Sequence, residues 1–186
     1  PGDIETRQIV ADLDADSRGE LLAIADGRAF VYEAIGDDAY RATWQSGASP
    51  ADGGVVGGGA DCDGDGFLDL YVTGFEAPDM SAYYRDMRLQ NRGDGSFEVV
   101  WAGGTQPGRG VAAADFDEDG DIDIYVSNYR LEPNILWQND GAGSFTNIAT
   151  PYQALGGHGH TIGSAWGYLD DDGHLDLFVG NFAHPG

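Results

Sequence analysis

The stretch ADFDEDGDIDIYVSN, residues 114–128, places six acidic side chains within nine positions and then turns apolar. The acids are Asp115, Asp117, Glu118, Asp119, Asp121 and Asp123. Closely spaced carboxylates repel one another, so such a stretch indicates a partner that neutralises the charge. The residues that follow, IYV at 124–126, are β-branched or aromatic and predict a buried strand.

The same pattern occurs four times along the chain. DCDGDGFLDLYVTG from Asp61 and YLDDDGHLDLFVGN from Tyr168 match the opening stretch closely, and DLDADSRGELLAIA from Asp12 is a fainter copy. The copies begin 49, 54 and 53 residues apart, which is the size of a propeller blade and longer than most helical or leucine-rich repeats. We therefore expect an all-β chain, a β-propeller segment of four-stranded antiparallel blades. About three and a half blades fit the chain, with units near 8–56, 57–109, 110–161 and an incomplete 162–186.

The third unit shows the expected layout of one blade. Its strands are predicted at 110–115, 123–128, 134–139 and 144–149, and the Asn/Asp-Gly segment between the last two is typical of a hairpin. The small residues of the first strand suit the crowded inner edge of a propeller. The tryptophans, which lie in or beside predicted strands, are expected in the core between blades rather than on a binding platform. They are Trp44, Trp101, Trp137 and Trp166.

Acids recur at positions 1, 3, 5 and 9 of each loop. The carboxylates with this spacing are Asp12, Asp14, Asp16 and Glu20; Asp61, Asp63, Asp65 and Asp69; Asp115, Asp117, Asp119 and Asp123; and Asp170, Asp172 and Asp176. Alternate carboxylates on a tightly curled loop can point at one centre, and a glycine at position 6 supplies the left-handed backbone that the curl needs. Oxygen ligands in a flexible loop favour calcium over magnesium, whereas softer metals require His or Cys. An EF-hand is not indicated, because its loop is longer and lies between helices.

The four loops differ in how completely they carry the pattern. The loops at 61–69 and 115–123 have every acid and the glycine, so two strong calcium sites are expected there. The loop at 12–20 has Ser17 at position 6, and the loop at 168–176 has Tyr168 at position 1, so two weaker sites are expected. A single Asp-Gly loop could equally be a solvated turn, but four copies in phase favour cation sites.

Composition limits the partners. A chain of 186 residues with 41% hydrophobic content can bury a core. Its 32 acids and nine Lys and Arg give a net charge of −23, which repels nucleic acid and attracts cations. Four divalent ions would reduce that charge by eight, to −15. No apolar run has the length of a membrane span. Cys62 is the single cysteine. The start at Pro1 predicts a processed or excised chain.

These residues resemble the FG-GAP/VCBS family of calcium-binding β-propeller repeats, which includes the head of integrin α-subunits. The likeness is strongest to bacterial relatives of the cartilage acidic protein family, through HTIGSAWGYLDDDGHLDLFVGNFAHPG (160–186) and ILWQNDGAGSF (135–145). The resemblance implies a further ligand, the backbone carbonyl at position 7 of each loop. These residues are Arg18, Phe67, Asp121 and His174. It also implies a secreted or cell-surface location, extracellular or periplasmic, and a role in adhesion, scaffolding or assembly.

No catalytic constellation is visible, so we expect a non-catalytic, calcium-stabilised protein. The alternative is a carbohydrate-binding or carbohydrate-cleaving propeller of the lyase type, an analogy from fold alone. An enzyme of that type would gather basic side chains in one groove, and the nine basic residues are spread along the chain. The expected partners are other protein chains, or the rest of a longer polypeptide that completes the propeller, together with glycans.

Three further motifs have both a functional and a structural interpretation. The RGD at 92–94 matches an adhesive tripeptide, but NRGDGSF also has the form of the ordinary hairpin. His158 and His160 could share a strand face and bind a transition metal, yet no third ligand accompanies them, so structural histidines are favoured. The segment 74–88 is a long insertion in which Tyr83 and Tyr84 either form a recognition surface or pack down.

Overall fold

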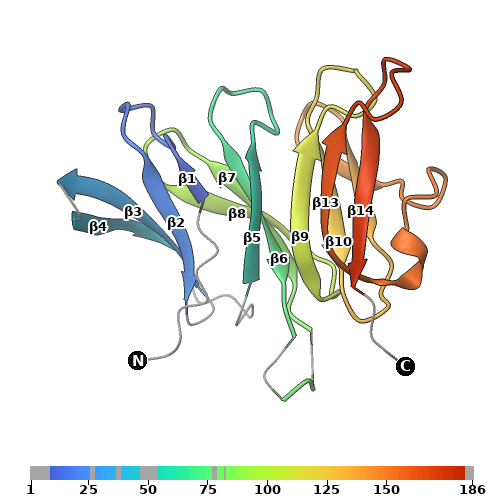
Figure 1. Ribbon diagram of the computed structural model, residues 1–186. Helices are drawn as coiled ribbons and strands as arrows, with labels where there is room; N and C mark the ends of the chain where they lie inside the picture. The colour runs from blue at the N-terminus through green and yellow to red at the C-terminus, as the bar shows by residue number, and fades with distance from the viewer. Residues whose placement is uncertain are drawn as a thin grey trace.

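The computed structural model of the chain contains four antiparallel sheets, each built from strands consecutive in sequence (Figure 1). It describes residues 9–25, 28–36, 39–46, 54–76, 79–81 and 83–182. The first sheet comprises β1 (Ile9–Ala11), β2 (Glu20–Ala25), β3 (Arg28–Gly36) and β4 (Ala39–Gln45). The second comprises β5 (Gly54–Ala60), β6 (Asp69–Gly74), β7 (Asp86–Asn91) and β8 (Phe97–Gly103). The third comprises β9 (Gly108–Ala114), β10 (Asp123–Asn128), β11 (Ile135–Asn139) and β12 (Phe145–Asn147).

The fourth sheet pairs β13 (His160–Gly167) with β14 (Asp176–Phe182). A three-residue 3-10 helix, η1 (Gly156–His158), precedes it. It is the only helix among the described residues, and it is far too short to cross a membrane. The prediction of an all-β chain built from antiparallel sheets is therefore confirmed.

The third sheet shows why the sequence folds in this way. Its four strands lie within two residues of the predicted ends, because alternating apolar runs are separated by residues that turn the chain. The hairpin between β11 and β12 turns at Gly141 and Gly143, whose φ angles are +74° and +76°. Gly93 and Gly95 turn the equivalent hairpin between β7 and β8 with φ angles of +71° and +78°. Both hairpins depend on the left-handed backbone that glycine adopts without strain.

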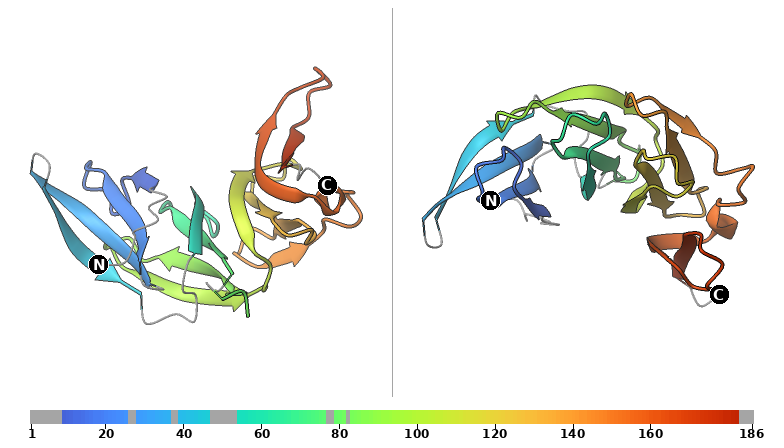
Figure 2. Two further views of the ribbon diagram at one scale, coloured as in Figure 1. Left: turned by 60° about the horizontal axis from the view of Figure 1, so that its bottom comes forward. Right: turned by 90° about the horizontal axis from the view of Figure 1, so that it is seen from above.

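The sheets stand side by side along an open arc, with the first strand of each sheet on the inner side and, in the three four-stranded sheets, the fourth strand on the outer side (Figure 2). On the inner side β5 contacts β9, and β9 contacts β13. The small residues predicted for these strands are needed there. A Cβ atom added to Gly110 of β9 would lie 3.3 Å from the Cα atom of Gly163 in β13, tighter than ordinary van der Waals contact.

An apolar core fills each junction between successive sheets. The first core joins residues such as Leu22 and Val31 to Leu70 and Leu89 of the second sheet. The second core joins the second and third sheets, and the third core joins the third sheet to β13 and β14. Every side chain of β6 and β10 is buried, because each of these second strands packs against a neighbour on both faces.

The tryptophans lie in these junctions, as predicted. Trp44 packs on Phe97 across the first junction, with 5.4 Å between ring centroids. Trp101 and Trp137 meet edge to face across the second junction, with centroids 5.5 Å apart. Trp166 stacks on Phe116 across the third junction at 5.8 Å. Each contact joins rings from two successive sheets, so the aromatic residues hold the arc together.

Candidate metal centres

The acid loops occupy the same place in all four sheets, between the first and second strands. They lie at one edge of the arc, at the top of Figure 1. Positions 4 and 6 of every loop have a left-handed backbone. At position 4 the residues are Ala15, Gly64, Glu118 and Asp171, with φ from +62° to +74°. At position 6 they are Ser17, Gly66, Gly120 and Gly173, with φ from +70° to +99°. The curl predicted from the glycine at position 6 is confirmed, and Ser17 adopts it without that glycine.

Carboxylates at positions 1, 3 and 5 maintain the curl by accepting hydrogen bonds from backbone N–H groups of their own loop. In the third loop, Asp115 accepts from the N–H groups of Asp119 and Gly120, both at 3.1 Å. Asp119 in turn accepts from the N–H of Asp121 at 3.0 Å. The second loop repeats these bonds, with Asp61 accepting from the two residues at positions 5 and 6. Such short-range bonds are the usual role of Asp in turns.

Three of the loops bring carboxylate oxygens to within 4.8 Å of one another. The clusters are Asp12, Asp14 and Glu20; Asp61, Asp63 and Asp65; and Asp115, Asp117 and Asp123. Each could hold a metal ion. Among the described residues the fourth loop forms no such cluster, although Asp170, Asp172 and Asp176 are all in place along it.

The acid at position 9 of the second and third loops is buried, and its hydrogen bonds join the loop to the third strand. Asp69 and Asp123 have exposed fractions of 2% and 0%. Each accepts a hydrogen bond from the N–H at position 2 of its own loop and another from the last residue of the third strand. Burial raises the pKa of both acids to about 6, although those backbone bonds oppose the shift. Glu20 replaces Asp at this position in the first loop, and burial raises its pKa as well.

Two buried carboxylate oxygens in these clusters have no hydrogen-bond donor. They are Oε1 of Glu20 and Oδ1 of Asp117. Buried polar atoms are nearly always paired in native proteins, so an unpaired carboxylate oxygen inside an acid cluster requires an explanation. A bound cation supplies one, because it would ligate the free oxygen and offset the repulsion among its neighbours. The residues present therefore fit a hard cation.

The third strand contributes polar residues that the sequence analysis did not assign. Gln138 donates from Nε2 to Asp117 Oδ2 at 2.6 Å, and Gln90 donates in the same way to Asp63. Both glutamines hold the acid at position 3 of the loop. The signal was present in the sequence as the repeated Gln-Asn pair at 90–91 and 138–139.

The asparagine after each glutamine links one loop to the loop of the preceding sheet. Asn139 donates from Nδ2 to the carbonyl of Cys62 in the second loop at 2.8 Å and to the carbonyl of Ile122 in its own loop at 3.2 Å. Asn91 makes the same two bonds one unit earlier, to Leu13 and Leu68 at 2.7 and 3.2 Å. A buried ladder of hydrogen bonds thus joins the first three acid loops.

Two sets of predicted ligands have other contacts in this structure. The residues at position 7 donate their N–H groups to the acid at position 5, at 2.8 to 3.0 Å. They are Arg18, Phe67, Asp121 and His174. Their carbonyl ligation stays a prediction. Asp16 and Asp119, at position 5, lie outside the clusters of their loops, whereas Asp65 belongs to its cluster.

The RGD segment has the same turn as the other hairpin. Arg92 pairs with Glu98, and Asp94 accepts from the N–H of Ser96 at 3.0 Å. The N–H of Arg92 donates to the carbonyl of Ser96 at 3.0 Å, and at the equivalent place in the third sheet the N–H of Asp140 donates to the carbonyl of Ser144 at 3.1 Å. The segment therefore has the geometry of the repeat, and its use in adhesion stays untested.

Of the two histidines, His160 has a packing contact and His158 is exposed. His160 lies against Tyr129 with 4.6 Å between ring centroids, and no histidine belongs to a metal-binding cluster in the described part of the chain. Tyr84 packs against the first core, while Tyr83 is 37% exposed and bridges to Glu76. Tyr84 therefore packs down against the core, whereas the bridge of Tyr83 to Glu76 lies within the insertion itself.

The structure places an acidic loop between the first and second strands of each successive antiparallel sheet. This arrangement defines the class of the protein, a β-sheet repeat protein with acidic loops. Residues 115–179 match the family model described as an FG-GAP-like repeat, so this part of the chain is similar to that family. The predicted resemblance to this family is confirmed. Its finer part, the likeness to VCBS repeats and to bacterial proteins, stays a prediction.

The chain is also similar to proteins named cartilage acidic protein 1. It is 35% identical over 105 residues to that of Xenopus tropicalis and 36% identical over 103 residues to that of Homo sapiens. These matches cover 53% and 52% of this chain but only 16% and 15% of the relatives. The chain thus corresponds to a small part of the length of the curated relatives it matches.

Proposed function

We propose that this chain forms blades of a calcium-stabilised β-propeller that serves as an extracellular scaffold or adhesion surface. The observation that carries the proposal is the recurrence of carboxylate clusters at the same place in three successive sheets, two of them with a buried oxygen that has no donor. The arc of sheets, with small first strands on its inner side, supports the propeller arrangement (Figure 2).

Calcium is the cation that the ligands favour. The clusters in the described residues contain only carboxylates, which select hard cations, and they lie on curled loops that can adapt to a large ion. Dissociation constants of about 10⁻⁴ to 10⁻³ M are expected, as in other extracellular calcium modules. Constants in this range suit a secreted or cell-surface protein, because calcium reaches millimolar concentrations outside cells.

The clusters support three sites rather than the two strong and two weak ones expected from the sequence. The first loop gathers Asp12, Asp14 and Glu20 in spite of Ser17, so we propose a calcium site there. The sites at 61–69 and 115–123 complete the set. We expect the weakest binding, or none, at 168–176.

The partner that we propose is a further unit of the same kind, packed on the face of the fourth sheet that points away from the third sheet. Phe178 occupies the position of Tyr71 and Tyr125 in the earlier sheets. Those tyrosines are 4% and 0% exposed beneath the next sheet, whereas Phe178 is 63% exposed. A sheet that covers Phe178 as the third sheet covers Tyr71 would remove this apolar surface from water. Such a unit could belong to another chain or to the same polypeptide.

We propose no catalytic role. The buried and clustered acids belong to the loops, except Asp86, which accepts hydrogen bonds from Tyr71 and Gly74 of its own sheet. The match to an FG-GAP-like repeat and the similarity to cartilage acidic protein 1 support a scaffold rather than an enzyme.

Thermal unfolding in calcium and in chelator tests the proposal. We expect calcium to raise the melting temperature of the chain, because an ion that binds only the folded state stabilises it. Asp117→Asn should reduce this increase, and Asp79→Asn should not, since Asp79 is exposed and bonds only to Ser81. Equal melting temperatures in excess calcium and in excess chelator would contradict the proposal.

A further inference from the structure

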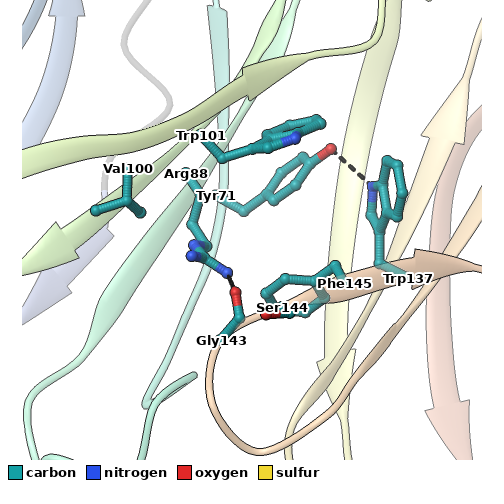
Figure 3. A pocket seen from close by; sticks show the side chains of 8 residues that line it. All are labelled: Tyr71, Arg88, Val100, Trp101, Trp137, Gly143, Ser144 and Phe145. Atoms are coloured by element: carbon teal, nitrogen blue, oxygen red, sulfur yellow. Dashed lines mark hydrogen bonds between the residues drawn. The ribbon is translucent and has the colours of Figure 1, made fainter.

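A cavity of about 320 Å³ lies between the second and third sheets, and its lining contains no residue of the acid loops (Figure 3). Four aromatic residues form most of its wall, Tyr71 and Trp101 from the second sheet and Trp137 and Phe145 from the third. Arg88 of β7, Val100 of β8 and the hairpin residues Gly143 and Ser144 complete it. The volume falls at the lower end of the range of small-molecule sites, which are typically concave, largely apolar and equipped with a few polar groups.

The aromatic wall is held in place by its own contacts. Tyr71 stacks on Trp101 with 6.2 Å between ring centroids. The indole N–H of Trp137 donates to the hydroxyl of Tyr71 at 2.9 Å, and that hydroxyl donates to Asp86 at 2.7 Å. A wall fixed in this way needs little reorganisation when a ligand enters.

Arg88 is the charged residue of the cavity lining, and in the described part of the chain no acid forms an ion pair with it. Its guanidinium donates to the carbonyl of Gly143 and lies 5.0 Å from the centroid of Phe145, while its Nε atom is buried without an acceptor. Five of the seven arginines whose side chains the structure describes form ion pairs, but Arg88 does not. This is unexpected in a chain with 32 acids and nine basic residues. The cavity lining contains no acid.

We propose that the cavity binds a small carboxylate that carries a ring. The carboxylate would accept hydrogen bonds from Arg88, whose planar guanidinium matches that group, and the ring would lie against the aromatic wall. Sugar acids and aromatic acids share this chemistry, since both a sugar ring and a benzene ring pack on aromatic faces. A cationic ligand is excluded by the charge of Arg88. The site goes beyond the proposed function and does not depend on calcium ligation.

The charge of the whole protein opposes binding of an anion. A net charge of −23 lowers the concentration of anions near the surface. At 0.15 M salt the screening length is about 8 Å, so the local charge of Arg88 dominates inside the cavity. Dissociation constants on the order of 1 mM are expected for ligands of about a dozen heavy atoms.

The experiment is a titration of the calcium-loaded chain at physiological salt with sodium glucuronate and with sodium phenylacetate. Binding is followed by the indole N–H signals of Trp101 and Trp137 in NMR spectra. Glucose and phenylacetamide serve as neutral analogues. We expect one of the two acids to shift both indole signals with saturation, and its neutral analogue to bind at least about tenfold more weakly, because the charge-assisted bond is absent.

Three variants locate the site. Arg88→Met should weaken binding of the acid at least about tenfold. Arg85→Met is the matched control, because Arg85 is exposed, lies outside the cavity and loses the same charge. Val100→Phe fills the cavity from its partly exposed rim and should abolish the shifts while leaving Arg88 in place.

Several outcomes would overturn the proposal. One is equal binding of acid and neutral analogue, and another is unchanged affinity in Arg88→Met. If Arg88→Met does not fold, Val100→Phe decides, and unchanged binding in that variant overturns the proposal. Absence of saturable shifts for both acids up to about 30 mM in the folded wild-type protein does the same. None of these results bears on calcium, which is tested separately by thermal unfolding.

Discussion

The third and fourth acid loops have nearly the same backbone but different arrangements of acids. Positions 4 and 6 have φ angles of +62° and +99° in the third loop and of +62° and +89° in the fourth. The third loop gathers Asp115, Asp117 and Asp123 into a cluster, whereas the fourth gathers none among the described residues. Curling of the loop therefore does not by itself create a metal site.

The difference lies in what surrounds each loop. Asp123 is fully buried and accepts from the N–H groups of Phe116 and Asn139. In the fourth loop, Asp176 is partly exposed and accepts from its own loop, and Tyr168, 64% exposed, stands where the first acid should be. A third strand with a Gln-Asn pair supports the loop at 115–123. The fourth sheet has two strands among the described residues, so the loop at 168–176 lacks this support. The carboxylates converge where the first acid and the third strand are both present.

Removing the asparagine that links two acid loops is expected to lower the free energy of unfolding more than any other change proposed here. Asn139→Ala removes the donor to the buried carbonyls of Cys62 and Ile122, and a lost donor costs about 2 kcal/mol for each carbonyl. We expect the free energy of unfolding to fall by about 4 kcal/mol, measured by urea denaturation. Asn181→Ala in the fourth sheet is the comparison. Its Nδ2 bond to Gly156 is exposed and its Oδ1 accepts from Thr161 Oγ1 at 2.7 Å, so we expect a loss of only about 1 kcal/mol. A smaller loss for Asn139→Ala than for Asn181→Ala would show that the ladder is not what distinguishes the two loops.

A second prediction concerns pH and compares the second unit with the third. Asp86 is fully buried against Tyr71, whereas Asn134 occupies the equivalent place beside Tyr125. Burial raises the pKa of Asp86 to about 6. The folded state therefore keeps this proton up to about pH 6, while the unfolded chain releases it near pH 4. As a result, the free energy of unfolding falls as pH rises from about 4 to about 6 and levels off above.

Asp86→Asn should remove this part of the pH dependence. The expected difference between wild type and variant is about 3 kcal/mol across pH 4 to 7, from a shift of about two pKa units. Urea denaturation at several pH values in chelator measures it, and subtraction cancels the other acids. Parallel curves for the two proteins would mean that Asp86 does not titrate as its burial predicts.

Removal of one acid should affect calcium binding in the third loop but not in the fourth. Asp115→Asn should lower the number of bound calcium ions by one and reduce the stability in about 10 mM calcium by about 2 kcal/mol, as expected for a millimolar or somewhat tighter site. Asp170→Asn should change neither value. Calorimetric titration gives the number of ions and thermal unfolding the stability. An equal effect of the two substitutions would contradict the ranking of the sites.

The smallest expected effect concerns the first loop. Ser17 holds a left-handed backbone at φ +70° where the other loops have glycine. Ser17→Gly should raise the free energy of unfolding by about 1 kcal/mol by relieving this strain, measured by urea denaturation. The reciprocal change Gly120→Ala should lower it, because φ is +99° there. A loss of stability in Ser17→Gly would mean that the serine contributes more than its backbone costs.

Much of the fold could be predicted because its signals are local. The strands of the third sheet follow from apolar runs bounded by Asn, Asp and Gly, and the loops follow from acids spaced two residues apart. The contributions of Gln90, Gln138, Asn91 and Asn139 could not be assigned in the same way. Each acts on an acid or a carbonyl that is distant in sequence, 16 to 78 residues away. Such a contact depends on which strands become neighbours.

The amino-acid sequence by itself determined the repeat, the strands and the curl of each loop, because hydrophobic periodicity and backbone preference act between residues close along the chain. Only the tertiary structure decided which acids converge, which are buried and which loops are tied together. It also decided that Arg88 faces an aromatic cavity without an acid beside it. These properties arise where two sheets pack, since burial and neighbouring charge depend on residues that only the folded arc brings into contact.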